Sequence, residues 1–121
     1  MIGWELERAF TFEAAHRLPN VPAGHPCARL HGHSYRVVLH LEGPLHAQYG
    51  WVVDFDHVMA QAETVRAQLD HRLLNEIPGL ENPTAELIGR WIYDGLADAL
   101  PELVGVSLHE TSDSCARYRG R

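Results

Sequence analysis

The sequence predicts an α+β fold in which a four-stranded antiparallel sheet carries two helices on one face. Segments with alternating apolar and polar residues, typical of half-buried strands, lie towards both ends of the chain. Two segments with helical apolar spacing lie between them. The resulting order is β-β-α-α-β-β, and 121 residues are enough for one domain, residues 1–121, with its own core.

The first two predicted strands have apolar residues at every second position. Residues 4–13 (WELERAFTFE) and 31–42 (HGHSYRVVLHLE) alternate in this way, although Arg8 interrupts the apolar face of the first. Residues 14–30 contain prolines and a glycine and are predicted to form a long loop, which is usually functional or disordered. The second strand presents six side chains on one face: His31, His33, Tyr35, Val37, Leu39 and Leu41.

Two amphipathic helices are predicted in the middle of the chain. The first follows Asp54, a suitable N-cap, and extends to about residue 70. The second is predicted to begin at Asn82 and Pro83, with proline at the first helical position, and to stop at Pro101.

The C-terminal part is predicted to return to the sheet. Residues 103–111 alternate, and a last short strand covers 116–118. A four-stranded open sheet has two edges that need to be covered or paired, so an oligomer is expected.

Composition narrows the possible partners. The net charge is −6, all ten basic residues are arginines, and no basic run is present, which disfavours binding to nucleic acid. No stretch reaches the ~18 apolar residues of a membrane helix, and the N-terminus lacks the features of a secretory signal. We expect a cytoplasmic protein that binds no membrane and keeps Cys27 and Cys115 reduced.

Three histidines form a candidate metal site. His31 and His33 lie on one face of a strand, about 7 Å apart along it. His16 follows the first strand and lies near the start of the second if the two pair antiparallel. Three neutral imidazoles with an open position are typical of catalytic zinc, although imidazole also suits copper, nickel or iron. The alternative for an H-x-H pair is a surface pair that binds no metal.

Four other residues are candidates for catalysis or ligand binding. Cys27 lies in the proline-rich loop, where a thiol beside a metal readily becomes a thiolate; its alternative is a small buried apolar residue. Asp70 and His71 fit a proton shuttle, although the residues alone favour a polar pair that ends a helix. Glu110 ends an apolar strand face, where it either accepts hydrogen bonds from a guanidine-like ring or marks the exit into solvent.

Five segments in order resemble the 6-pyruvoyltetrahydropterin synthase superfamily: FTFEAAHRL, CARLHGHSY, LDHRLLN, GLENPTAE and HET. The resemblance covers about residues 8–120. Three residues separate Cys27 from the H-G-H motif, which resembles the bacterial 6-carboxy-5,6,7,8-tetrahydropterin synthase branch, a branch of queuosine biosynthesis. The family varies in the position of a later cysteine, so the resemblance assigns no role to Cys115.

The resemblance implies the fold and the metal. It implies the tunnelling fold, in which subunits join their sheets into a barrel, typically a trimer, and two trimers stack into a hexamer. It also implies that His16, His31 and His33 bind Zn²⁺ and that Cys27 is the general base.

The same resemblance implies a reaction at subunit interfaces. Asp70 and His71 would form a proton relay supplied by the neighbouring subunit, and Glu110, helped by Thr111, would hold the amino-pyrimidine edge of a pterin. The implied substrate is 7,8-dihydroneopterin triphosphate, and the implied products are 6-carboxytetrahydropterin, acetaldehyde and triphosphate. Four residues are candidates for holding the triphosphate: Arg17, His25, Arg29 and Arg72.

Three alternative functions stay open at this point. An enzyme of the same fold would form 6-pyruvoyltetrahydropterin and retain the side chain. A zinc hydrolase would generate hydroxide and need no Cys27. A non-catalytic pterin- or purine-binding module would need Glu110 but not the histidines.

Overall fold

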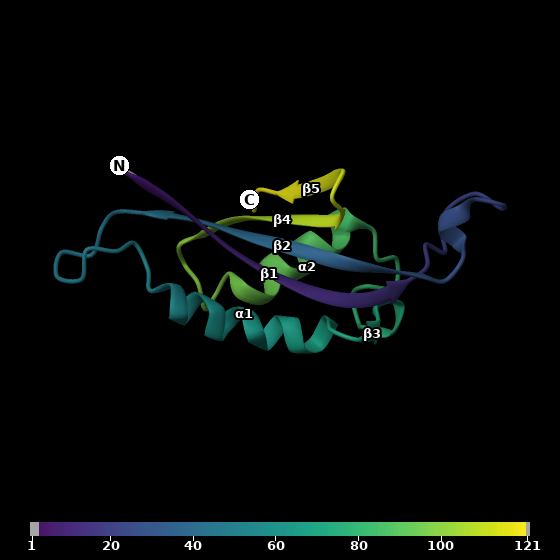
Figure 1. Cartoon of the computed structure of the whole chain (residues 1–121), viewed down its shortest axis with the longest axis horizontal. Helices are drawn as coiled ribbons and strands as arrows, with labels where there is room; N and C mark the ends of the chain where they lie inside the picture. Colours follow the sequence, from purple (N-terminus) through teal and green to yellow (C-terminus); the bar gives the residue numbers. More distant parts are fainter. Residues whose placement is uncertain (1–2, 121) are drawn as a thin grey trace.

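The computed structural model describes residues 3–120 and contains a twisted five-stranded sheet with two helices packed on one face (Figure 1). The strand order is β3-β1-β2-β4-β5. The predicted α+β class is therefore confirmed, with one strand more than predicted. The elements are β1 (Trp4–His16), η1 (Pro26–Ala28), β2 (His31–Gly43), α1 (Phe55–Leu69), β3 (Arg72–Leu73), η2 (Leu74–Glu76), α2 (Ala85–Leu96), β4 (Leu103–Thr111) and β5 (Ser114–Tyr118).

The long antiparallel pair of β1 and β2 is the centre of the sheet. Their register is unbroken from Trp4–Gly43 to His16–His31. The prediction that the loop begins at residue 14 is wrong, because the strand continues to His16. Buried Ala14 keeps the alternation going beyond the predicted end, and each added residue gains a partner on β2.

The fifth strand, β3, was not predicted. Ala14 and Ala15 of β1 pair in parallel with Arg72 and Leu73 of β3. Two residues are too short to show a period of two, so no apolar pattern marks this strand. Its effect is to bring the segment after α1 next to the end of β1.

Capping side chains mark where the two α-helices begin. The Asp54 carboxylate accepts a hydrogen bond from the backbone N–H of Asp56 at 2.9 Å, which confirms the predicted N-cap of α1. The predicted start of the second helix at Asn82 and Pro83 is wrong. Instead the Thr84 hydroxyl caps α2 by accepting from the backbone N–H of Leu87 at 3.2 Å. The helix also ends at Leu96 rather than near residue 100, and a turn follows.

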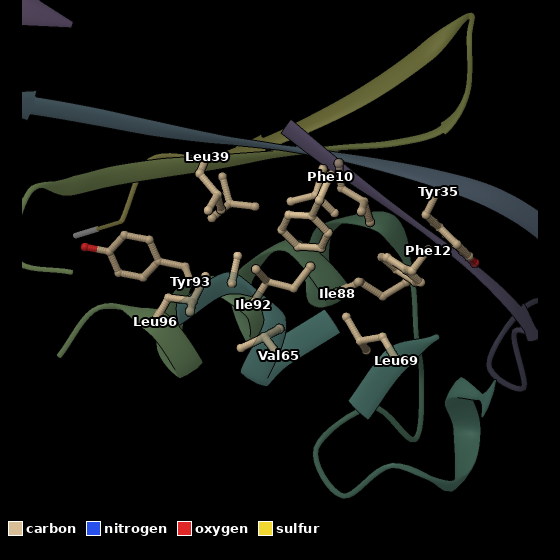
Figure 2. Close-up of a cluster of buried hydrophobic side chains, with 14 of the residues drawn as sticks. Phe10, Phe12, Tyr35, Leu39, Val65, Leu69, Ile88, Ile92, Tyr93 and Leu96 are labelled. Carbon is tan, nitrogen blue, oxygen red and sulfur yellow. The ribbon is translucent and has the colours of Figure 1, made fainter. Parts of the chain in front are cut away.

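The core lies between the sheet and the helices (Figure 2). Phe12 and Tyr35 stack with their ring centroids 4.7 Å apart, close to the end of β1. Burying a side chain of this size stabilises the fold by roughly 1.5–3 kcal/mol. Trp4, predicted on the apolar face of the first strand, is instead exposed, as is Phe55 at the start of α1, and both border an open cavity of about 500 Å³.

The C-terminal hairpin completes the sheet. β5 begins at Ser114, two residues earlier than predicted, and pairs antiparallel with β4. In the part of the chain that the structure describes, neither helix is long and apolar enough to cross a membrane.

Candidate active site

Three histidines meet where β1 ends and β2 begins. His16 is the last residue of β1 and lies directly opposite His31, while His33 follows two residues along β2 on the same face. Their potential ligand atoms all lie within 4.8 Å of one another. His16 is buried, whereas His31 and His33 are half-buried, so the cluster is open to solvent on one side.

Two backbone carbonyls fix the tautomers of two of these rings. Nδ1–H of His16 donates to the carbonyl oxygen of Pro83 at 2.8 Å, and Nδ1–H of His31 donates to the carbonyl oxygen of Arg29 at 2.7 Å. A carbonyl oxygen only accepts, so in both rings the proton is on Nδ1 and the lone pair is on Nε2. Histidine metal ligands are typically oriented by such an outer hydrogen bond.

Burial leaves polar atoms without partners beside the cluster. Among residues 3–120, Nε2 of His16 and the hydroxyl of Tyr35 are buried and have no hydrogen-bond partner. Burial lowers the pKa of His16, against the opposing effect of its bond to Pro83, so the neutral ring is favoured. Burial also raises the pKa of Tyr35, helped by the nearby carboxylate of Glu110, so this side chain stays a phenol.

The donor set fits a metal ion. The lone pairs on Nε2 of His16 and His31, with His33 beside them, converge on one point. An ion bound there would satisfy the buried Nε2 of His16, which the protein leaves unpaired. Three neutral imidazoles and an open side are typical of a catalytic rather than a structural site.

Glu110 connects this cluster to a small cavity. Its Oε2 lies 3.9 Å from Nε2 of His16, and the side chain is 27% exposed. The same residue borders a cavity of about 210 Å³ beside Leu108, Ala85 and Cys115. A carboxylate that faces both a histidine cluster and a cavity can accept hydrogen bonds from a bound ligand.

Thr111 has a different local role. Its hydroxyl accepts a hydrogen bond from the backbone N–H of Asp113 at 3.3 Å, within the turn between β4 and β5. Thr111 does not border the cavity beside Glu110.

Cys27 lies close to the site along the backbone but is no member of the histidine cluster. It is in η1, within the loop that extends beyond the end of the sheet (Figure 1). The carbonyl of Cys27 accepts from the backbone N–H of Leu18 at 2.8 Å, which ties the loop to the residues after His16. Its thiol is half-buried, and within residues 3–120 the close group of ligand atoms contains only the three histidines.

Asp70 and His71 form a pair at the end of α1. Nδ1–H of His71 donates to Oδ2 of Asp70 at 2.9 Å, and His71 has a left-handed φ of 58°. Asp70 also accepts from the backbone N–H of Glu13, which is the largest cause of its lowered pKa, followed by His71. The side chain of His71 is 77% exposed against 19% for Asp70, so the imidazole is free to meet a ligand.

The structure does not bring this pair into the histidine cluster. His71 borders an open cavity of about 540 Å³ together with Glu13, Ser34 and Arg72, and His33 of the cluster also lines this cavity. Glu13 and Ser34 alternate with Ala14 and His33, so their side chains lie on the sheet face opposite the helices. Within one chain, the acid–base pair and the cluster therefore share one cavity through His33, but neither Asp70 nor His71 belongs to the close group of ligand atoms.

The candidate triphosphate residues are dispersed. Arg72 borders the larger cavity, whereas Arg17 and Arg29 are exposed near the loop. Nδ1 of His25 accepts from the backbone N–H of Cys27 at 3.0 Å and so caps η1.

Two contributors to the site were missed by sequence reasoning. Pro83 acts through its carbonyl oxygen, which no side-chain pattern reveals. Tyr35 was placed on the same face as the histidines, but only as an apolar residue. Its position two residues after His33 was the available signal, since alternate residues of a strand share a face.

The chain matches a known protein family along nearly its whole length. Residues 5–121 match the family described as 6-pyruvoyl tetrahydropterin synthase. The chain is 40% identical to the 6-carboxy-5,6,7,8-tetrahydropterin synthase of Synechocystis, over 95% of this chain and 92% of that protein. It is 31% identical to the Bacillus subtilis protein of the same name, over 96% of this chain and 85% of that protein.

Solved structures show the same fold. The 6-pyruvoyl tetrahydropterin synthase of Caenorhabditis elegans superposes with a TM-score of 0.90 at 24% identity, covering 98% of this chain and 96% of that one. A catalytic-residue mutant of the corresponding enzyme from Plasmodium vivax gives a TM-score of 0.71 at 22% identity, covering 96% of this chain and 98% of that one.

Proposed function

This chain belongs to the 6-pyruvoyl tetrahydropterin synthase family and is an enzyme, and we propose that its reaction is that of a zinc-dependent carbon–carbon lyase. The proposed substrate is 7,8-dihydroneopterin triphosphate, and the products are 6-carboxy-5,6,7,8-tetrahydropterin, acetaldehyde and triphosphate. The 40% identity to a relative of that name over nearly the whole chain is the main support. The proposed pathway is queuosine biosynthesis.

The overall conversion balances without an external oxidant. It consumes one water, releases the triphosphate and cleaves the bond between the first and second side-chain carbons. The first carbon reaches the oxidation level of a carboxyl group while the dihydropterin ring becomes a tetrahydropterin. The reaction therefore needs proton transfers and an electrophile but no redox cofactor.

The proposed metal is Zn²⁺, held by His16, His31 and His33. A zinc ion bound there supplies Lewis acidity that makes the side-chain hydroxyls of the substrate more acidic. The hydrogen bonds from Nδ1 of His16 and His31 to backbone carbonyls support this assignment, because they keep both Nε2 lone pairs directed into the cluster.

Three residues are proposed to contact the substrate. Glu110 accepts hydrogen bonds from the amino-pyrimidine edge of the pterin, while Thr111 contributes at the neighbouring turn. Cys27 as thiolate removes the proton from the carbon attached to the ring, and the negative charge delocalises into the dihydropterin. The proposed compartment is the cytoplasm, which keeps this thiol reduced.

His71 is proposed to move protons as the triphosphate leaves and the side chain breaks. Asp70 holds Nδ1–H of His71 and leaves Nε2 to exchange protons. Because this pair does not join the histidine cluster of its own chain, we propose that each active site combines the histidines of one subunit with the Asp70–His71 pair of its neighbour.

The proposed assembly is a trimer-based barrel, with two trimers stacked into a hexamer. The open edges of the sheet support it. β3 covers only Ala14 and Ala15 of β1, which leaves the outer backbone edge of the earlier part of β1 free, and β5 is the other edge. Pairing of these edges between subunits would satisfy both.

One incubation tests the proposed reaction. Zinc-loaded protein is mixed with 7,8-dihydroneopterin triphosphate, the pterin product is identified by mass spectrometry, and acetaldehyde is assayed separately. Carboxytetrahydropterin together with acetaldehyde supports the proposal. A pyruvoyl product would assign the sister activity, and unchanged substrate with the oligomer and zinc intact would refute both. Protein treated with a chelator is the control for metal dependence.

A further inference from the structure

The orientation of His16 depends on an irregular segment of backbone. Its Nδ1–H donates to the carbonyl oxygen of Pro83 at 2.8 Å, and the ring has no other hydrogen bond within residues 3–120. Pro83 lies between η2 and α2, outside any helix or strand. Pro83 is buried, but the sheet's hydrogen-bond ladder does not hold its carbonyl. Contacts of the neighbouring backbone therefore keep it opposite His16, and the cap of α2 at Thr84 is one of them.

The side-chain amide of Asn75 contacts the backbone beside both partners of the His16–Pro83 hydrogen bond. The side chain of Asn75 accepts from the backbone N–H of Arg17 at 3.0 Å and donates to the carbonyl oxygen of Arg17 at 2.8 Å. Its Nδ2 also donates to the carbonyl oxygen of Glu81 at 3.3 Å. Arg17 directly follows His16, and Glu81 precedes Pro83 by two residues.

The amide has a fixed support of its own. Asn75 is the middle residue of η2, and the preceding Leu74 is fully buried in the core. The two-point contact with Arg17 resembles one rung of a β-ladder in which an amide side chain replaces a strand. It extends the fixed backbone of β1 by one residue beyond His16, at the place where pairing with β2 stops.

We propose that Asn75 is the positioning residue for His16. Its hydrogen bonds to Arg17 and Glu81 fix the backbone next to His16 relative to the segment that contains the carbonyl of Pro83. The Nδ1–H tautomer of His16, with its Nε2 lone pair directed into the cluster, is then the only one favoured. The effect of Asn75 on zinc binding rests on the zinc site proposed above. Its effect on the orientation and tautomer of His16 applies to the metal-free protein as well.

Two substitutions of Asn75 test its three hydrogen bonds. Asn75→Ala removes all three hydrogen bonds. Asn75→Asp keeps an acceptor for the N–H of Arg17 but places a second carboxylate oxygen against the carbonyls of Arg17 and Glu81, which only accept. Val65→Ala, in the core of α1, is the matched control because it weakens the fold away from the cluster.

The first readout is the tautomer of His16 in the full-length chain freed of metal by a chelator. Long-range ¹H–¹⁵N correlation spectra at pH 8 should show a single Nδ1–H tautomer for His16 in the wild type and in Val65→Ala. Both Asn75 variants should show a mixture. His31 is an internal control, because its Nδ1–H donates to Arg29, which Asn75 does not contact.

The second readout is the affinity for zinc, measured by competition with a chromophoric chelator. Loss of an outer partner typically costs 10- to 100-fold in metal affinity, so we expect a weakening of about tenfold in both Asn75 variants. Circular dichroism should show that they are folded. If Asn75→Ala does not fold, Asn75→Asp decides.

A folded Asn75 variant with one His16 tautomer and wild-type zinc affinity would overturn the proposal. An unchanged tautomer with weaker zinc binding would also overturn it, since Asn75 would then act by another route. If the wild type binds no zinc, the metal site proposed above fails, and the tautomer of His16 still decides the role of Asn75.

Discussion

His16 and His31 lie directly opposite each other in the β1–β2 pair, and their ring centroids are 4.6 Å apart. The register of the two longest strands thus determines the spacing of two candidate metal ligands. A shift of one residue would turn one of the two imidazoles to the other face of the sheet. The geometry of the candidate site therefore depends on the register of β1 and β2.

Replacement of His31 by alanine should abolish tight zinc binding while the fold is kept. The ring is half-buried and its loss leaves only His16 and His33 in the cluster. We expect the zinc bound per chain after dialysis to fall by at least about tenfold, because two imidazoles do not complete a zinc site. Elemental analysis of the dialysed protein measures it.

The control for this change is His57→Ala, which removes an exposed imidazole on α1. Its zinc content should equal that of the wild type. Full occupancy in His31→Ala would mean that the three histidines are not the site.

Replacement of Cys27 by alanine should leave the metal in place and remove turnover. The thiol is half-buried in η1 and outside the close group of histidines, so zinc content should not change. Loss of a general base typically costs about 10²- to 10⁴-fold in rate, which we expect in kcat. His57→Ala, at an exposed position of α1 away from the cluster, should keep its rate. A near-normal rate in Cys27→Ala would exclude the thiol as the base.

Glu110→Gln should weaken binding of the pterin more than it slows the reaction. The amide keeps the size of the side chain but presents an N–H group to ring donors that need an acceptor. Hydrogen bonds to a charged group contribute about 1.5–3 kcal/mol, so we expect KM to rise by roughly 10- to 100-fold. Initial rates over a range of substrate concentration measure this change.

The matched control is Glu76→Gln, which neutralises an exposed carboxylate in η2. Zinc content should be unchanged in both variants. A KM of the wild-type value in Glu110→Gln would remove Glu110 from the pterin site.

Much of the fold follows from local patterns in the sequence. The alternation in 4–13 and 31–42 located the central strands, and Asp54 located the start of α1. β3 was missed because a strand of two residues is too short to show an alternation of apolar and polar residues. The start of α2 was misplaced because Pro83, a good first helical residue, instead precedes the cap at Thr84.

The candidate site was predictable where it depends on strand geometry. The placement of His31 and His33 on one face, near His16, follows from a period of two and antiparallel pairing. The carbonyl of Pro83 and the amide of Asn75 act across 67 and 58 residues of sequence. Such contacts depend on the tertiary fold, so no local pattern contains them.

Asp70→Asn should make the free energy of unfolding less dependent on pH in the acidic range. The N–H of Glu13 and the imidazole of His71 hold the pKa of Asp70 below its usual 3.8. A lowered pKa stabilises the folded state fully above the unfolded value and loses this effect as pH falls through the folded value. Wild type should therefore be more stable than Asp70→Asn at pH 7, and the difference should shrink below about pH 4. Urea denaturation at pH 7, 5 and 3.5 measures it, and an equal difference at every pH would contradict the prediction.

Mixing two inactive variants tests whether the active site is shared between subunits. His71 is outside the close group of histidine ligand atoms of its own chain, although His33 lines the same cavity, and the proposed shared site takes His71 from one subunit and Cys27 from another. Cys27→Ala and His71→Ala should each be inactive alone. After joint refolding, random assembly should restore about a quarter of wild-type activity, because a working site draws two suitable subunits independently.

The matched control mixes Cys27→Ala with His31→Ala, two changes on the same side of the shared site. Here a site that receives an intact Cys27 lacks His31, and one that receives an intact His31 lacks Cys27. We therefore expect no rescue in this mixture, whatever the subunit ratio. If the first mixture also stays inactive while both variants assemble with native circular dichroism, the relay acts within one chain. His71 would then have to reach the histidines by a movement of the segment after α1.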